Sequence, residues 1–60
     1  MSSAASMIWK EILDAPIGAT RLLAGEEWEK VQKASGTTRW VNAKGRELTA
    51  VQMYDASISG

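Results

Sequence analysis

The sequence contains no cysteine, no histidine and no phenylalanine, and it has a single proline. Without cysteine the chain forms no disulfides and offers no thiolate ligand. Without histidine it lacks the commonest transition-metal ligand and general base, and its serine and threonine hydroxyls have no imidazole to activate them. We therefore expect a protein that is not an enzyme and has no catalytic residues, no metal site and no cofactor.

An excess of charge of one sign is also missing, because seven Lys and Arg residues balance seven Asp and Glu residues. Dedicated nucleic-acid binders usually carry a basic excess, so this balance argues against nucleic acid as the main partner. No apolar run approaches the roughly 20 residues that span a bilayer, and the first residues lack the basic region of a signal peptide. We expect a cytoplasmic protein that makes no membrane contact.

The chain has 60 residues, which is enough for one domain at most. A domain of this size buries only about 60% of the surface that its unfolded chain exposes, so it needs dense packing or a partner. Its three tryptophans can each bury about 150–250 Å², which supplies dense packing. We expect Trp28 and Trp40 to lie in the core, and apolar surface left uncovered to favour a homodimer.

The spacing of apolar residues predicts two kinds of structure in the first two thirds of the chain. Residues 3–14 combine good helix formers with an apolar stripe at helical spacing, which predicts a short amphipathic helix that ends before Pro16. Residues 17–41 contain three β-prone runs separated by turn signals at Gly25 and Gly36. These short connections predict an antiparallel β-meander.

Residues 42–58 begin with a turn and then leave two alternatives open. The pair Thr49 and Gln52 fits a capping box, which favours a short helix, but the same segment can extend the sheet as a fourth strand. The predicted fold class is therefore α+β. A short N-terminal helix packs on a three- to four-stranded antiparallel meander, with or without a short C-terminal helix.

The register of the first hairpin depends on the length of its loop, which we place at Gly25-Glu26. A two-residue loop sets Leu23 opposite Trp28, but it also brings two basic residues face to face. A three-residue loop sets Leu22 opposite Trp28, and we prefer it. Apolar residues occupy both odd and even strand positions, which indicates either a bulge or a sheet with both faces partly covered.

The N-terminal helix carries more apolar surface than one small sheet face requires. Part of the stripe can pack on the domain's own sheet, and the rest is then available to a protein partner or a second copy. The candidate partner-binding residues are Met7, Ile8, Trp9 and Ile12. We therefore expect a non-enzymatic protein-interaction module.

Tryptophans on adjacent strands with basic neighbours provide an alternative, which is weak binding of single-stranded nucleic acid by stacking. The candidate residues are Trp28, Lys30, Lys33, Arg39 and Trp40. Two observations argue against this function: Glu27 and Glu29 flank Trp28, and a domain without phenylalanine needs both tryptophans in its core. We rank nucleic-acid binding below protein binding.

Proline, glycine or tryptophan marks four short runs, at residues 16–20, 25–31, 39–41 and 45–49. Together these runs resemble short proteins of unknown function that bacteriophages and prophages of actinobacteria encode, and that often carry a similar tryptophan-containing meander. The resemblance implies an accessory factor that binds or inhibits a host protein. It names no catalytic residue, cofactor or target.

Overall fold

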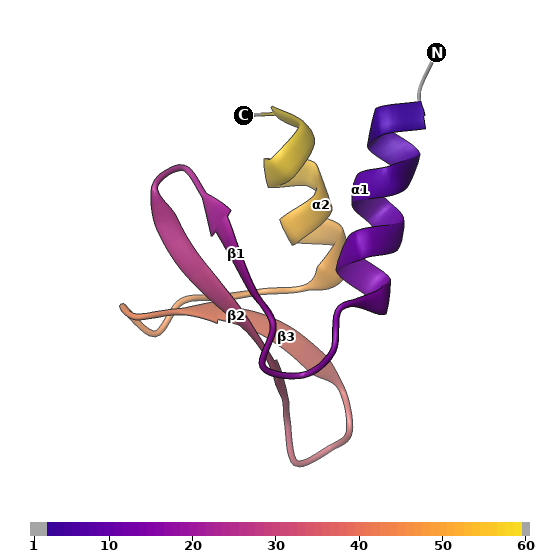
Figure 1. Cartoon of the computed structure of the whole chain (residues 1–60). Helices are drawn as coiled ribbons and strands as arrows, with labels where there is room; N and C mark the ends of the chain where they lie inside the picture. Colours follow the sequence, from indigo (N-terminus) through magenta and orange to yellow (C-terminus); the bar gives the residue numbers. More distant parts are fainter. Residues whose placement is uncertain (1–2, 60) are drawn as a thin grey trace.

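The computed structural model describes residues 3–59 and consists of a helix, four strands and a second helix (Figure 1). Helix α1 spans Ser3–Asp14 and helix α2 spans Ala50–Ser59. The strands are β1 (Thr20–Leu23), β2 (Glu26–Gln32), β3 (Thr38–Asn42) and β4 (Glu47–Leu48). The predicted α+β class, N-terminal helix and meander are confirmed.

The four strands form one antiparallel sheet in the order β1-β2-β3-β4. The two helices pack beside each other and form a layer over one face of this sheet (Figure 1). The buried core between the layers consists of Ile12, Trp28, Trp40 and Met53. Trp28 and Trp40 are only 3% and 1% exposed, which confirms their predicted place in the core.

The segment after the β3–β4 turn contains both structures that the sequence left open. Leu48 of β4 pairs with Trp40, and α2 begins two residues later. Thr49 and Gln52 form the predicted capping box: the Thr49 N–H donates to Gln52 Oε1 at 2.9 Å, and the Gln52 N–H donates to Thr49 Oγ1 at 3.2 Å. The fourth strand is therefore short because the cap that starts α2 follows it directly.

The β1–β2 hairpin has a different register from both predictions. Its two loop residues are Ala24 and Gly25, with φ of 52° and 80°, as a type I′ turn requires. Trp28 lies opposite Arg21, so the predicted pairings of Trp28 with either leucine of β1 are wrong. Gly25 occupies the second loop position rather than the first, which shifts the register and leaves Glu26 inside β2.

Side chains of β2 alternate regularly between the two faces of the sheet. Trp28 and Lys30 are buried on the helix side, whereas Val31 lies on the outer face, half-buried. The β2–β3 pairing has no interruption, so both faces of the sheet hold apolar side chains. A two-against-one arrangement lies just before β1, where the Gly18 N–H donates to Lys30 O and the Lys30 N–H donates to Ala19 O.

Candidate interaction surface

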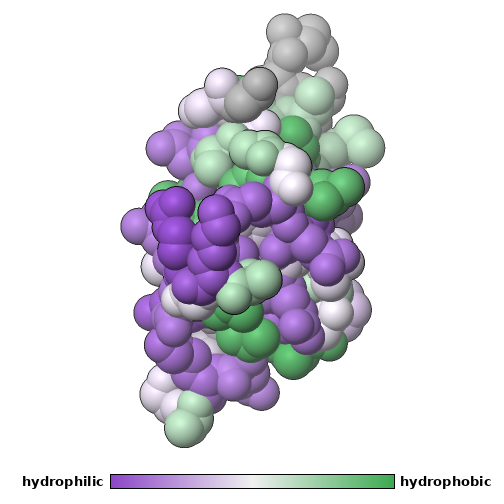
Figure 2. Space-filling model, turned by 90° about the vertical axis from the view of Figure 1, so that its left-hand side faces the viewer, coloured by the Kyte–Doolittle hydropathy of each residue, from purple (hydrophilic) through white to green (hydrophobic). Residues whose placement is uncertain are grey.

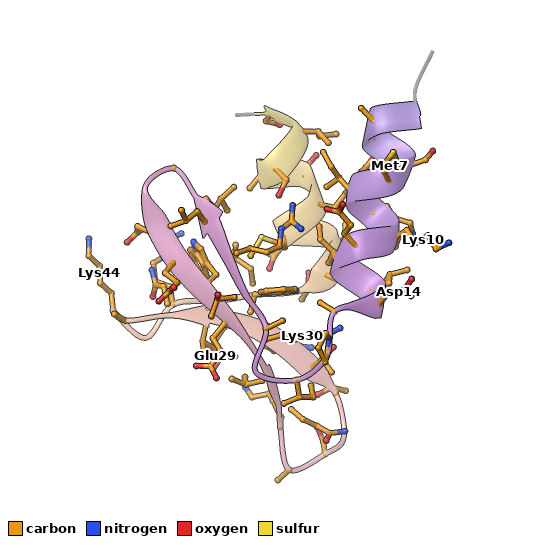
Figure 3. All side chains as sticks on the ribbon, in the orientation of Figure 1. Met7, Lys10, Asp14, Glu29, Lys30 and Lys44 are labelled. Atoms are coloured by element: carbon orange, nitrogen blue, oxygen red, sulfur yellow. The ribbon has the colours of Figure 1, made fainter. Side chains whose placement is uncertain are left out.

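The four residues predicted to contact a partner lie at different depths of α1. Ile12 is fully buried, and Ile8 packs against the core. Trp9 is half-buried, while Met7 is 63% exposed on α1 (Figure 3). Ile8 and Ile12 are one helical turn apart and so share the inner side of α1. Ile12, predicted as a contact residue, is instead a core residue, and Met7 and Trp9 lie two residues apart on different sides of α1.

Trp9 packs against Tyr54 of α2 in an edge-to-face arrangement. The ring centroids are 5.3 Å apart and the ring planes are inclined by 76°. Ser6 and Val51 lie beside this pair, and the four residues line an open groove of about 390 Å³ between the two helices. Trp9 therefore packs on the second helix of its own chain.

Helix α2 adds apolar residues that the sequence analysis did not assign to a partner surface. Val51 and Ile58 are 64% and 47% exposed, and Tyr54 lies between them at helical spacing. This spacing is visible in the sequence, but in a strand the same residues would not all share a face. The capping box was the signal that could have identified the stripe.

The face that carries the β1–β2 loop and the β3–β4 turn is largely hydrophilic (Figure 2). Seen from the side of the β1–β2 loop and the β3–β4 turn, hydrophilic side chains cover much of the surface, and apolar ones form separate groups (Figure 2).

The residues predicted for nucleic-acid binding do not share one exposed surface. Trp28 and Trp40 lie in the core, so bases could stack on them only if the core opened. Lys30 is 7% exposed and faces the helices, whereas Arg39 lies on the outer face of the sheet. Lys33 is exposed but forms an ion pair of 2.8 Å with a glutamate of β4.

Lys30 joins the sheet to the end of α1 (Figure 3). Its Nζ donates to the carbonyl oxygens of Ile12, Leu13 and Ala15 at 3.1, 3.1 and 2.8 Å. Carbonyl groups at a helix C-terminus have no partner within the helix and carry a partial negative charge. All three protons of the ammonium group are thus satisfied, which explains why this cation is buried and not available to a phosphate.

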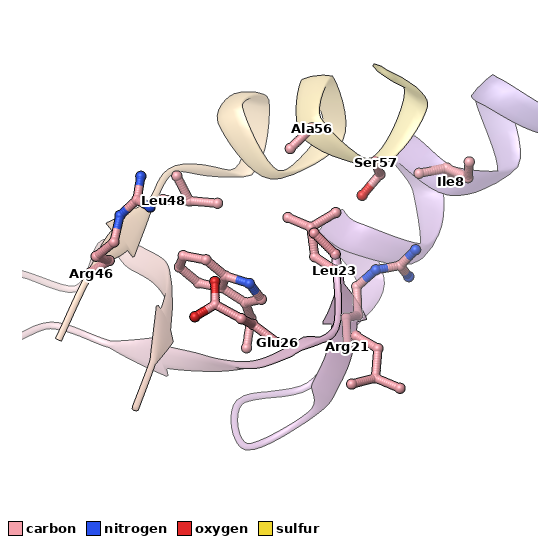
Figure 4. Close-up of a pocket in the computed structure, with 11 residues that line it drawn as sticks. Ile8, Arg21, Leu23, Glu26, Arg46, Leu48, Ala56 and Ser57 are labelled. Atoms are coloured by element: carbon pink, nitrogen blue, oxygen red, sulfur yellow. The ribbon is translucent and has the colours of Figure 1, made fainter. Parts of the chain in front are cut away.

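A second hollow, of about 600 Å³, lies between the β1–β2 hairpin and α2 (Figure 4). Leu23 and Leu48 form apolar walls, while Arg21 and Arg46 lie at opposite ends (Figure 4). The indole N–H of Trp28 is buried and has no acceptor within residues 3–59. Protein atoms enclose this nitrogen, so a ligand in the hollow could not reach it. Arg21 already forms an ion pair with α1 at 3.2 Å, and we assign no ligand here.

In residues 3–59, no group of three or more acidic side chains could hold a metal ion, and neither helix has the length and apolar character needed to cross a bilayer. Compared with known proteins, the chain matches no protein-family model, no curated protein and no solved structure.

Proposed function

We propose that this chain is a non-enzymatic protein-interaction module whose partner binds the outer surface formed by α1 and α2. This surface, the helix face, comprises Ser6, Trp9, Leu13, Val51, Tyr54 and Ile58. The Trp9–Tyr54 pair carries the proposal, because it forms a partly buried aromatic floor between apolar side chains that stay exposed. Leu13, Val51 and Ile58 are 50%, 64% and 47% exposed.

An amphipathic helix is the partner element that fits this face best. Trp9 and Leu13 are four residues apart on α1, and the apolar residues of α2 are three and four apart, so each helix presents one stripe. A third helix in the groove would place its own apolar residues between the two stripes. Burial of this surface stabilises the complex by roughly 25 cal/mol per Å² of apolar area, less the costs of association.

The proposal includes a cytoplasmic location and a phage-type accessory role in which the chain binds or inhibits a host protein. The location is supported by the lack of cysteine, and the role by the resemblance of the meander to phage-encoded proteins. Met7 is exposed on another side of α1, about 200° around the helix from Trp9, so the predicted partner-binding residue Met7 lies outside the helix face.

The substitution Val51→Glu tests the helix face. The immobilised chain captures proteins from the lysate of a candidate host, and the captured protein is then titrated against the parent and the variant. We expect Val51→Glu to weaken binding by about tenfold or more, because it introduces an unpaired carboxylate into an apolar contact. Ile17→Glu is the matched control, since Ile17 is also exposed, at 53%, but lies in the loop after α1.

The control distinguishes binding through the helix face from non-specific binding to exposed apolar residues. The far-ultraviolet circular dichroism of both variants should match that of the parent, because both positions are exposed. If the two substitutions weaken capture equally, or if neither does, the helix face is not the binding surface. Failure of the parent to retain any protein would count against the proposed function itself.

A further inference from the structure

Strand β1 lies at one edge of the sheet and has a free side. Within residues 3–59 it pairs with β2 alone, and it is the first strand in the order β1-β2-β3-β4 (Figure 1). Such an edge presents backbone N–H and C=O groups that another strand can pair with. The opposite edge, β4, offers only two residues.

The hydrogen-bond pattern shows which residues of β1 turn their backbone groups to the free side. The Lys30 N–H donates to Ala19 O at 2.9 Å, so the carbonyl group of Ala19 faces β2. Antiparallel strands alternate in this respect, so Arg21 and Leu23 also face β2. The N–H and C=O of Leu22 are therefore directed to the free edge.

The side chain of Leu22 makes this edge apolar. At 77% it is the most exposed of the large hydrophobic residues in the described part of the chain. It lies on the outer face of the sheet, opposite Glu27 of β2, and so receives no cover from the helices. The neighbouring Arg21 points the other way and is held by an ion pair with Glu11 of α1, so its charge does not shield Leu22.

We propose that β1 pairs with β1 of a second copy of this chain, antiparallel about a two-fold axis that passes beside Leu22. The backbone of Leu22 then exchanges two hydrogen bonds with Leu22 of the second copy, and both leucine side chains meet on the outer face. The result is a continuous eight-stranded sheet with the helix layers of both copies on the same side.

The choice of register follows from charge and burial. A pairing centred on Arg21 would set two arginines directly opposite each other, which is unfavourable. A pairing centred on Thr20 would set Leu22 opposite Gly18, which has no side chain to cover it. Only the pairing centred on Leu22 buries both leucines, and it also sets Arg21 opposite Leu23 rather than opposite another cation.

This dimer does not use the helix face. In each copy the helix face lies on α1 and α2, whereas the pairing edge belongs to the sheet. The capture experiment and the dimer experiment can therefore fail separately. Because a two-fold axis perpendicular to the sheet keeps both helix layers on one side, the dimer would offer two helix faces to a bivalent partner.

Sedimentation equilibrium of the parent, Leu22→Lys and Val51→Lys tests the proposal. We expect the average mass of the parent to rise towards that of a dimer as its concentration increases from about 10 μM to about 1 mM. Leu22→Lys should weaken dimerisation at least tenfold, because it places two cations against each other at the axis. Val51 is an exposed apolar residue of the helix face, so Val51→Lys should leave dimerisation unchanged.

Amide hydrogen exchange gives a second measurement that needs no substitution. The Leu22 N–H is directed to the free edge of the sheet, so its exchange should be fast in dilute solution and slow at high concentration. The proposal is overturned if the parent remains monomeric at all concentrations, or if the exchange rate of the Leu22 amide does not depend on protein concentration. If Val51→Lys abolishes dimerisation and Leu22→Lys does not, the second copy binds the helix face and the edge pairing is wrong.

Discussion

The Nζ atom of Lys30 lies 2.8 Å from the carbonyl oxygen of Ala15, the residue that follows the last residue of α1. The same ammonium group bonds two more carbonyl oxygens in the last turn of the helix. A strand side chain thus closes the C-terminus of α1, where a glycine often does so in other helices. This contact joins the two layers at the point where the chain turns from α1 towards β1.

Replacement of Lys30 by methionine should destabilise the fold. The Lys30→Met side chain keeps an apolar stem but removes all three donors, so the free energy of unfolding should fall by about 2–4 kcal/mol. The control is Lys33→Met, which removes an exposed ion pair and should destabilise the fold far less. Urea unfolding followed by tryptophan fluorescence measures both, and equal losses would mean that Lys30 contributes no more than a surface charge.

The two core tryptophans should be far more important for stability than the third. Trp28→Ala and Trp40→Ala should each cost about 3–5 kcal/mol, which is enough to unfold a marginally stable domain of this size. Trp9→Ala should cost only about 1–2 kcal/mol, because its ring is half-buried and its main loss is the contact with Tyr54. Thermal unfolding that is unchanged in Trp40→Ala would contradict the core described above.

Local signals in the sequence predicted most of the fold. The apolar stripe of residues 3–14, the β-prone runs and the capping box at Thr49 each act within a few neighbouring residues, so each can be identified without knowledge of the tertiary structure. The core positions of Trp28 and Trp40 followed from the need of a small domain to bury its largest side chains.

The sequence did not predict the role of Lys30, the hairpin register or the contact of Trp9 with Tyr54, because these depend on long-range contacts and on an unusual backbone conformation. The hydrogen bonds from Lys30 to the end of α1 join residues 15–18 apart in the sequence. The sequence contained one sign that Lys30 points inward: it lies two residues after Trp28, and alternate residues of a strand share a face. The predicted hairpin register was wrong because Ala24 adopts a positive φ, which residues with a Cβ rarely do. The pairing of Trp9 with Tyr54 required α2 to be identified as a helix first.

The strained loop residue Ala24 offers a stabilising substitution. Asparagine tolerates positive φ and is favoured at the first loop position of a type I′ turn, so Ala24→Asn should raise the free energy of unfolding by about 0.5–1 kcal/mol. Gly25→Ala should lower it by about 1 kcal/mol, for conformational reasons alone, because no atom lies within 4 Å of the added Cβ. Chemical denaturation that places the two variants in the opposite order would show that the loop has another geometry.

The ion pair between Lys33 and Glu47 should make a pH-dependent contribution to stability. The hydrogen bond from Lys33 Nζ, at 2.8 Å, lowers the pKa of Glu47 from its ordinary value of 4.5, and the charge of Lys33 acts in the same direction. A carboxyl group with a lowered pKa in the folded state stabilises that state above its unfolded pKa. The contribution is then lost as the pH falls through the folded value.

Lys33→Met should therefore return the pKa of Glu47 towards 4.5 and remove this contribution at neutral pH, while stability below the folded pKa stays the same as that of the parent. The difference between variant and parent should appear as the pH rises from acid towards 4.5, and it should stay small because both side chains are partly exposed. A titration of the side-chain carboxyl carbon by nuclear magnetic resonance measures the pKa directly. Lys44→Met is the control, since Lys44 approaches Glu26 instead and its loss should leave Glu47 unaffected. If the pKa of Glu47 is the same in Lys33→Met and in the parent, the ion pair does not persist in solution. The β2–β3 loop, which contains Lys33, then has no ionic contact with Glu47 of β4.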